Sequence, residues 1–461
     1  MRRNLGWFGV VTAAGIALRL FFLLSFPLLT PDTFFYGDIA KNLLQHGVYG
    51  VSAAGGVAPT YIRVPGYPGF LAAVFTVFGM EHYRAVLVIQ LCFDIGTCFV
   101  TADLVRRTVG DRGAKIAFLL VSLCPFLANY VAAGLTETLE IFFTVLALDA
   151  AVIGFDQLRS RPARYRGWVL CGTASGCAIL LRPDGAILLA ALGLYLGLRG
   201  ARELLRRQNG AKRILRAGLL CGGVAVAPLV PWTLRNLYTM HRFQPLAPRY
   251  ANDPGEVVPT GFQRWSRTWV AEYVSTEEVY WPMPGEHIDP GKLPRRAFDS
   301  EAERQQTMNV LATYNQQLAF DPALDAQFEQ LAEQRIRAAP LRYYLWLPSL
   351  RILDMWARPR TELLPIQSRW WEFDDEPHWI AAAVILGALN LLYIGSALSG
   401  ALWGSKVRFA GLFGLFVLLR SAFLGTLENP EPRYTLECYP IIILFAAALL
   451  VGRRPAGRRL V

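Results

Sequence analysis

The apolar run LGWFGVVTAAGIALRLFFLLSFPLL at residues 5–29 leads directly into the polar stretch TPDTFFYGDIAKNLLQHG at residues 30–47. The apolar run is long enough to cross a bilayer, which requires about 20 consecutive apolar residues. The polar stretch carries two carboxylates, Asp32 and Asp38. The junction therefore predicts a chain that leaves the membrane near residue 29 and presents acidic groups at the boundary between lipid and water.

Small and apolar residues recur at helical spacing within the polar stretch. The positions i, i+3, i+4, i+7, i+8 and i+11 are occupied by Tyr36, Ile39, Ala40, Leu43, Leu44 and Gly47. This spacing predicts a short helix with one apolar face, lying on the membrane surface rather than across it. We expect Asp32 to sit just before this helix, where an aspartate is also a favoured cap.

The composition predicts a polytopic membrane protein. Of the 461 residues, 54% are hydrophobic, and the apolar residues occur in runs of about membrane-spanning length. The predicted fold is mainly α, with about ten spans, interfacial helices in the first exterior loop and a small exterior domain. We place the spans at residues 5–29, 84–105, 113–131, 136–155, 167–183, 184–198, 217–236, 378–399, 409–426 and 438–452.

These spans divide the chain into three parts. They are an N-terminal membrane module (1–236), whose first exterior loop (30–83) holds the acidic groups, an exterior domain (237–377) and C-terminal spans (378–461). Within the exterior domain we predict helices near 300–319 and 322–339. The aromatic and basic segment 341–360 is typical of an interfacial anchor, because Trp, Tyr and Arg favour the headgroup level.

Basic residues gather in alternate short loops. One side of the membrane receives Arg2 and Arg3, then Arg106 to Lys115, Arg159 to Arg166, Arg199 to Arg216, Lys406 and Arg408, and four residues after Val451. By the positive-inside rule this side is cytoplasmic. We therefore expect an integral, multi-pass protein of a bacterial inner membrane with both termini cytoplasmic. The net charge of +11 reflects these loops, so we expect no nucleic-acid partner.

Two charged residues fall inside the predicted spans. Arg19 lies ten residues before the outer end of the first span, and Asp94 lies ten residues after the start of the second. At a rise of 1.5 Å per residue, both sit about 15 Å below the outer boundary. An isolated charge at that depth costs at least a few kcal/mol. The sequence therefore predicts an ion pair between Arg19 and Asp94.

Cysteine and histidine spacing offers no metal or disulfide pattern. The seven cysteines lie in or beside apolar runs, and the five histidines are scattered without a ligand-like spacing. We expect no metal site and no cofactor. No glycine-rich βαβ unit or D-x-D motif indicates a nucleotide-sugar donor.

A series of motifs resembles one known family. The pattern Asp32-x-x-x-Tyr36, followed by Ala40, Leu43 and Gly47, then by Arg63-x-Pro-Gly-Tyr67-Pro-x-Phe70, resembles the first exterior loop of the GT-C glycosyltransferases. More narrowly, it is similar to the branch with the protein O-mannosyltransferases and the lipid A aminoarabinose transferase (glycosyltransferase family 39-like). The similarity continues, in order, through Leu135-Thr136-Glu137, Leu181-Arg182-Pro183, Pro231 to Asn236, Ile336 to Trp346, and Arg433-Tyr434.

The resemblance implies a concrete reaction. A hexosyl or pentosyl group moves, with inversion, from a polyprenyl phosphate to an acceptor hydroxyl on a glycan, lipid or protein at the exterior (periplasmic or luminal) side. Attack by a hydroxyl needs a base, and the phosphate needs positive charge, for which Arg is well suited. By this resemblance the catalytic residues are Asp32 and Asp38. The family often has a second carboxylate where this chain has Thr33; either that carboxylate is absent here, or Asp38 stands in for it. The implied substrate-binding residues are Tyr36, Arg63, Tyr67, Glu137, Arg182, Arg235, Arg433 and Tyr434. Membrane lipids are further partners.

Each residue also has a plainer interpretation. Asp32 can cap a helix, Asp38 can be a solvated flank, and Glu137 can favour the positive end of a helix. Arg182 and Arg235 can snorkel at helix ends. A secondary transporter and a non-catalytic scaffold of the same fold are the alternative functions, and activity on a polyprenyl-phosphate sugar separates the three.

Overall fold

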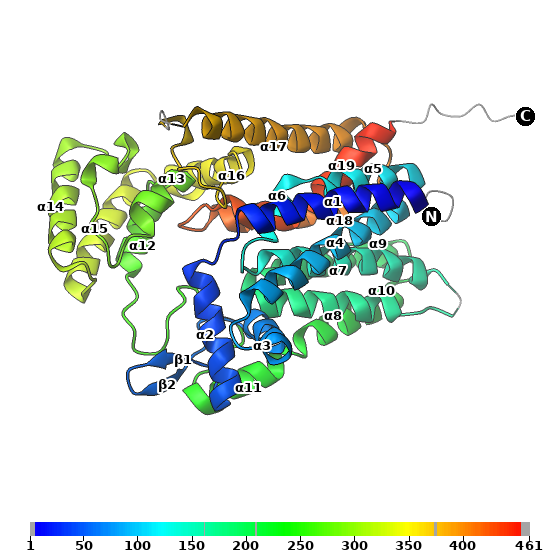
Figure 1. Ribbon diagram of the computed structural model, residues 1–461, viewed down its shortest axis with the longest axis horizontal. Helices are drawn as coiled ribbons and strands as arrows, with labels where there is room; N and C mark the ends of the chain where they lie inside the picture. The colour runs from blue at the N-terminus through cyan, green and yellow to red at the C-terminus, as the bar shows by residue number, and fades with distance from the viewer. Residues whose placement is uncertain (1–4, 161, 208–209, 373–375, 453–461) are drawn as a thin grey trace, which may run out of the picture. The chain divides into compact units, whose positions relative to one another are not determined.

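The computed structural model describes residues 5–160, 162–207, 210–372 and 376–452 (Figure 1). It divides into two compact units. The first contains residues 1–253, 392–417 and 436–461, and the second contains residues 254–391 and 418–435. Two helices, α17 (Pro377–Trp403) and α18 (Ala410–Gly425), contribute residues to both units. The predicted three-part division refers to the membrane, so it stays a prediction.

The first unit is a bundle of helices. It contains α1 (Leu5–Ser25), α4 (Tyr83–Thr108), α5 (Asp111–Ser122), α6 (Pro125–Tyr130), α7 (Glu137–Leu158), α8 (Arg166–Leu181), a 3₁₀ turn (Pro183–Gly185), α9 (Ala186–Leu205), α10 (Ala211–Val226), α11 (Leu229–Met240) and α19 (Tyr439–Val451). Helix α7 packs against both α4 and α8 and is mostly buried. It is therefore a central helix of this unit, and its first residue, Glu137, is held in place by its neighbours.

The apolar helices agree with a membrane protein. Among the described residues, six segments are long and apolar enough to cross a membrane: α1, α4, α7, Pro183–Leu205, α17 and Pro432–Val451. Helices α10 and α11 together form one further candidate, bent by 40°, and α3 (Gly66–Phe78), α8 and α18 are shorter apolar helices. The predicted fold class is confirmed, while the count of ten spans stays a prediction. Among the predicted cytoplasmic positions, Arg2, Arg3, Arg161 and the four arginines after Val451 lie outside the described residues.

The predicted surface helix is α2 (Pro31–His46). Its N-cap is Thr30, which forms a reciprocal capping box with Thr33, and Gly47 ends it with φ +67°. Asp32 therefore lies in the first turn of the helix, and the prediction that it precedes or caps the helix is wrong. Thr30 rather than Asp32 is the cap, because the Thr30 hydroxyl, one residue before Pro31, accepts a hydrogen bond from the Thr33 amide, which has no partner within the helix.

The apolar face of α2 packs against α3. Ile39 and Ala40 are fully buried, and Ala40 joins a core cluster with Tyr67, Leu71 and other side chains of α3, α4, α7 and α8. The cluster fixes α2 to the bundle, so the first turn of α2 has a defined position relative to α7. Leu44 departs from the prediction, since its side chain is exposed.

A short hairpin follows α2, although the sequence analysis did not predict it. Strand β1 (Gly50–Ala53) pairs antiparallel with β2 (Gly56–Pro59), with Gly50 opposite Pro59 and Ala53 opposite Gly56. The Gly and Ala residues of this stretch carry no strand periodicity, which explains the omission.

The second unit contains α12 (Thr260–Arg267), α13 (Tyr273–Ser275), α14 (Glu301–Gln317), α15 (Pro322–Ala338) and α16 (Leu347–Ala357), with π-helical turns at Thr276–Tyr280 and Arg342–Trp346 and 3₁₀ turns at Pro290–Lys292, Arg295–Ala297, Trp370–Glu372 and Pro432–Cys438. The last of these turns ends in the first unit. Helices α14 and α15 confirm the two helices predicted for the polar segment. An aromatic core with Phe262, Trp265, Trp269, Tyr314 and Phe328 holds this unit together.

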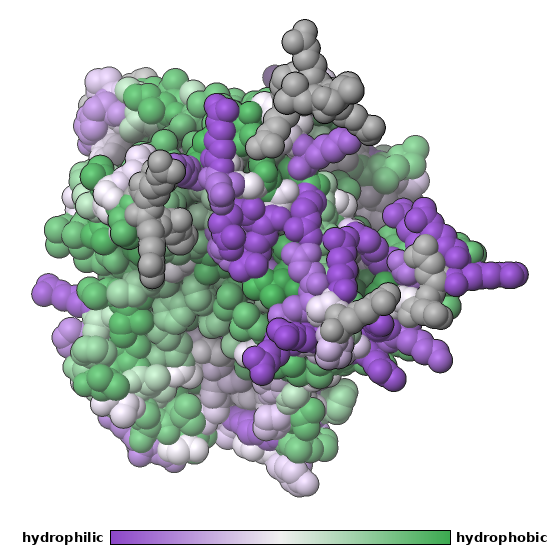
Figure 2. Space-filling view, turned by 90° about the vertical axis from the view of Figure 1, so that its right-hand side faces the viewer, coloured by the Kyte–Doolittle hydropathy of each residue, from purple (hydrophilic) through white to green (hydrophobic). Residues whose placement is uncertain are grey.

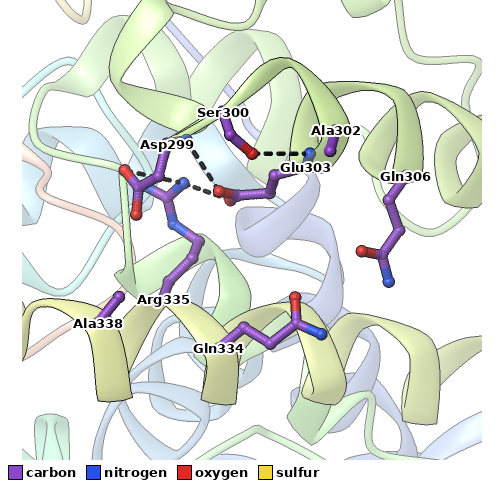
Figure 3. A pocket seen from close by; sticks show the side chains of 8 residues that line it. All are labelled: Asp299, Ser300, Ala302, Glu303, Gln306, Gln334, Arg335 and Ala338. Atoms are coloured by element: carbon purple, nitrogen blue, oxygen red, sulfur yellow. Dashed lines mark hydrogen bonds and ion pairs between the residues drawn. The ribbon is translucent and has the colours of Figure 1, made fainter.

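A buried arginine connects the two predicted helices of this unit (Figure 3). Arg335 of α15 points toward the start of α14, where its guanidinium lies 2.5 Å from Glu303 and 3.6 Å from Asp299. Its remaining donors reach the carbonyl oxygens of Ala297 and Arg296 and the hydroxyl of Thr268. A small pocket of about 270 Å³ lies beside this network. Because the donors of Arg335 are occupied by acceptors within the protein, we assign the network a structural role.

The segment 341–360 exposes several large apolar side chains. These are Leu341, Tyr344, Leu345, Trp346 and Leu353, whereas Leu347, Arg351 and Met355 are buried. This two-sided helix is what we expect of an interfacial anchor. Its position in a membrane stays a prediction.

Candidate active site

Asp32 and Arg63 form an ion pair in the segment predicted to be the first exterior loop. Asp32 comes from the first turn of α2, and Arg63 comes from the segment between β2 and α3. Arg63 Nη2 lies 3.1 Å from Asp32 Oδ1, and 39% of the Asp32 side chain is exposed. The carboxylate is therefore held by one cation and remains open to a reactant.

Two aromatic rings surround the Arg63 guanidinium. Its central carbon lies 5.3 Å from the Phe35 ring centre and 5.8 Å from the Tyr36 ring centre, distances at which a cation is attracted to a ring face. Burial lowers the pKa of Arg63, but Tyr36 and Asp32 outweigh this effect and raise it. Burial also raises the pKa of Tyr36. Arg63 thus stays charged, and Tyr36 stays a neutral hydroxyl.

Arg182 lies among three carboxylates. Its guanidinium is 3.1 Å from Glu137, 3.2 Å from Asp184 and 3.4 Å from Glu140. Glu137 is the first residue of α7, and Arg182 directly follows α8 as its C-cap. Glu137 and Glu140 are almost completely buried. The charges of Glu137 and Arg182 also act on Tyr36, together with those of Asp32 and Arg63. Tyr36 therefore lies within electrostatic range of both groups.

The sequence analysis missed Glu140 and Asp184. Glu140 follows Glu137 at i+3 and so shares its helix face, and Asp184 is two residues from Arg182. Either spacing is a usable signal. The motif Thr136-Glu137-Thr138-Leu139-Glu140 contains both carboxylates of the α7 first turn.

A close backbone approach sets the first turn of α2 against the turn before α7. The Leu28 amide donates to Ala132 O and the Gly134 amide donates to Leu28 O. A Cβ on Gly134 would lie 2.4 Å from Thr33 Cγ2, so this contact requires glycine. Thr33 is completely buried there. Thr33 therefore fills the space beside Gly134.

Asp38 contacts the hairpin rather than Arg63. One oxygen accepts from the Ser52 amide at 2.7 Å and the other from the Ser52 hydroxyl at 2.6 Å. The amide of Asn42 donates to Gly50 O and to the Ser52 hydroxyl. Asp38 therefore has a structural contact that holds β1 against α2, and its catalytic role stays a prediction.

Arg235 holds the base of the same hairpin. Its Nη1 donates to Thr60 O at 2.6 Å, and its Nη2 donates to Tyr49 O. The guanidinium also lies over the rings of Tyr49 and Trp232. Because carbonyl oxygens already occupy these donors, the contacts favour a structural role for Arg235 over phosphate binding.

Tyr67 is buried, with its ring 5.0 Å from that of Tyr36 in an edge-on arrangement. Its hydroxyl donates to Gln90 at 2.7 Å, and the Gln90 amide donates to Ala133 O. Tyr67 is therefore fixed by Gln90 and packs its ring against that of Tyr36. Arg433 and Tyr434 belong to the second unit, where both contact Glu431.

No group of three metal-ligating His, Cys, Asp or Glu side chains occurs within the described ranges.

Part of the chain that contains these residues matches a known protein family. Residues 63–232 match the family model of dolichyl-phosphate-mannose-protein mannosyltransferase. A comparison with curated protein sequences gives no match. The matched segment includes Arg63, Tyr67, Glu137 and Arg182.

Two solved structures are similar to this chain. The oligosaccharyltransferase AglB from Archaeoglobus fulgidus, in complex with an inhibitory peptide and a dolichol-phosphate, has a TM-score of 0.52 at 12% identity, and the match covers 97% of this chain and 50% of that one. ArnT from Cupriavidus metallidurans in the apo state has a TM-score of 0.41 at 16% identity, with 96% and 78% covered. This chain thus spans about half the length of AglB. The family match and the AglB fold confirm the predicted resemblance to the GT-C glycosyltransferases, in the mannosyltransferase-like branch.

Proposed function

We propose that this protein is a membrane glycosyltransferase that moves a sugar from a polyprenyl-phosphate donor to an acceptor hydroxyl on the exterior side. The observation that carries the proposal is the ion pair of Asp32 with Arg63, which sets a base beside a cation in the loop with the family pattern. The matching family model is that of dolichyl-phosphate-mannose-protein mannosyltransferase, and AglB has been solved with a dolichol-phosphate. A lipid phosphate is therefore the natural donor to test.

Asp32 acts as the general base in this proposal. The acceptor hydroxyl attacks the anomeric carbon from the face opposite the phosphate, and the bond between that carbon and the phosphate oxygen breaks. The hydroxyl proton passes to Asp32, and the polyprenyl phosphate leaves with the bonding electrons. One displacement from the opposite face inverts the anomeric centre. The exposed fraction of Asp32 leaves room for the acceptor.

Arg63 neutralises the phosphate. Among the described residues its ion pair is with Asp32 alone, and that pair is partly exposed. A phosphate oxygen that binds the guanidinium competes with the Asp32 carboxylate for the same positive charge. Donor binding would then loosen Asp32 from Arg63 at the moment when Asp32 has to accept a proton.

Arg182 has a different role from Arg63. Three carboxylates already surround its guanidinium. We assign Arg182 to the positioning of Glu137, whose carboxylate is suited to hydrogen bonds with sugar hydroxyls. Phosphate binding rests mainly on Arg63.

The proposal is tested with the purified full chain in detergent. Polyprenyl-phosphate sugars that differ in the sugar are incubated with exterior glycan, lipid and protein acceptors, and release of polyprenyl phosphate is measured. We expect release with at least one donor. Binding of the donors without any release would support the scaffold alternative, and failure to bind any of them would overturn the proposal.

A further inference from the structure

A cavity of about 880 Å³ lies in the first unit, at the end of the bundle opposite the first exterior loop. Helix α4 begins at Tyr83, close to that loop, and ends at Thr108, directly before the cavity. The walls come from the connection between α4 and α5, from the end of α17 and the turn after it, and from α19. Three segments distant in sequence therefore form one site.

Figure 2 looks onto this end of the bundle and shows hydrophilic side chains projecting from its middle, with hydrophobic ones beside them. The predicted topology places this end on the cytoplasmic side, at the headgroup level of the inner leaflet. A cavity at this level is in contact with both water and lipid.

The basic residues that flank the cavity have acidic partners. Arg106 and Arg107 lie 2.6 Å and 2.7 Å from Asp103, and Arg107 also pairs with Asp149. Arg408 pairs with Asp156. The positive charges of these flanking residues are therefore paired with carboxylates of the protein itself.

The two cations that line the cavity differ from their neighbours. Arg112 and Lys406 are exposed, and neither forms an ion pair with any residue in the described part of the chain. One carboxylate, Asp111, also lines the cavity, but it occupies the first turn of α5, where the helix dipole favours a negative charge. Within the described ranges, neither Arg112 nor Lys406 is ion-paired, and these two cations outnumber Asp111, the acidic side chain in the lining.

The same cavity has an apolar wall. Leu402, which is 65% exposed, and Phe445 of α19 line it beside Lys406 and the hydroxyl-bearing Ser405. A site with cations on one side and apolar side chains on the other matches a lipid, whose phosphate and acyl chains differ in the same way. A free phosphate ion would use only the polar side.

We propose that this cavity binds the anionic headgroup of a phospholipid, with the phosphate at Arg112 and Lys406 and the first part of an acyl chain on Leu402 and Phe445. Basic pockets between membrane helices on the cytoplasmic side are suited to anionic lipids, and each Lys or Arg near the surface contributes about 1 kcal/mol. The proposal is independent of the transfer reaction, because the cavity lies at the other end of the bundle.

The test measures lipid binding to the full chain in a neutral detergent by native mass spectrometry. Short-chain phosphatidylglycerol is titrated against the wild type, the double variant Arg112→Gln/Lys406→Gln and the control Arg202→Gln/Arg206→Gln. The control residues are exposed and without an ion pair in the described residues, but they lie outside the cavity. We expect the first variant to bind about 30-fold more weakly, the worth of two surface cations, and the control to bind as the wild type does.

Four results would overturn the proposal. They are unchanged binding by the cavity variant, equal weakening in the control, equal binding of zwitterionic phosphatidylcholine, and displacement of the lipid by the same concentration of inorganic phosphate. Size-exclusion profiles of all three proteins show whether they are folded. If the double variant does not fold, the single variants Arg112→Gln and Lys406→Gln are compared instead, each with an expected loss of about 5-fold.

Discussion

Arg19 and Asp94 form a buried ion pair that joins α1 to α4, with Arg19 Nε 2.6 Å from Asp94 Oδ2 and both side chains almost completely buried. The guanidinium also donates to Gly15 O at 3.1 Å and to Ser122 O. Each charge therefore has a partner, as burial in an apolar environment requires. The pair confirms the prediction made from the equal depth of the two residues.

Removal of one partner leaves the other charge buried and unpaired. We expect Arg19→Met and Asp94→Leu each to destabilise the fold by about 3–5 kcal/mol, seen as a lower thermal unfolding temperature in detergent. The exchange Arg19→Asp/Asp94→Arg should recover only part of this loss, because an aspartate at position 19 cannot donate to Gly15 O and Ser122 O. An exchange variant no better than the worse single variant would argue against the pair.

The second prediction concerns Asp32 as the general base. Thr30 and Thr33 cap α2, so Asp32→Asn should leave folding nearly unchanged. The amide cannot accept the acceptor proton, so turnover should fall by about 10²–10⁴-fold. Sugar transfer and thermal unfolding are measured on the same samples. Asp38→Asn is the matched control: it should cost far less activity, because Asp38 contacts Ser52. Full activity in Asp32→Asn would move the search to Asp38 and Glu137.

The third prediction tests whether Asp32 and the donor phosphate share Arg63. Affinity for polyprenyl phosphate is measured for the wild type, Asp32→Asn, Arg63→Gln and the double variant. We expect Asp32→Asn to bind more tightly than the wild type, since Arg63 is then released, and Arg63→Gln to bind more weakly. In the Arg63→Gln background, Asp32→Asn should have little further effect.

Simple repulsion between Asp32 and the phosphate would give a different result. In that case Asp32→Asn would tighten binding equally in both backgrounds, and the cycle would show no coupling. This outcome would contradict the competition for Arg63 while leaving the role of Asp32 as a base open to the turnover experiment.

The fourth prediction follows from Asp354 in α16. Burial raises the pKa of this carboxyl to about 6, and the carboxyl accepts a hydrogen bond from the Tyr273 amide. In an unfolded chain its pKa is about 3.9. Between these values the folded protein binds a proton that the unfolded chain has lost, so this contribution to stability is complete below about pH 4 and is lost as pH rises through about 6.

Asp354→Asn removes this titration and keeps an acceptor for Tyr273. The unfolding temperature of Asp354→Asn minus that of the wild type should therefore increase between pH 4 and pH 6.5. The subtraction removes the effect of other titrating groups that the two proteins share. A difference that is constant with pH would show that Asp354 does not titrate in this range.

The fifth prediction concerns topology. Cysteines placed at Arg207 and Gln305 are treated with an impermeant maleimide in intact cells. We expect labelling at Gln305→Cys only, because the basic short loops place Arg207 on the cytoplasmic side. Labelling of Arg207→Cys would show that position 207 faces the exterior and would contradict the predicted orientation. Arg454, also predicted to be cytoplasmic, lies outside the described residues.

Local pattern was sufficient for part of this protein. The apolar runs, the stripe of α2 and the helices α14 and α15 follow from side-chain periodicity, which each segment carries by itself. The Arg19–Asp94 pair could be predicted because both residues lie at the same predicted depth in the membrane, and an unpaired charge at that depth is unfavourable. The order of the loop motifs similarly indicated the family.

The tertiary structure decided which charges meet. Asp32 and Arg63 are 31 residues apart, and Glu137 and Arg182 are 45 apart. Asp38 and Arg235 form hydrogen bonds with the hairpin and the residues beside it, although their sequence context did not distinguish them from site residues. Periodicity reports which face of a helix is apolar, but the partner of a polar side chain depends on how distant segments pack, and that information is absent from any single segment.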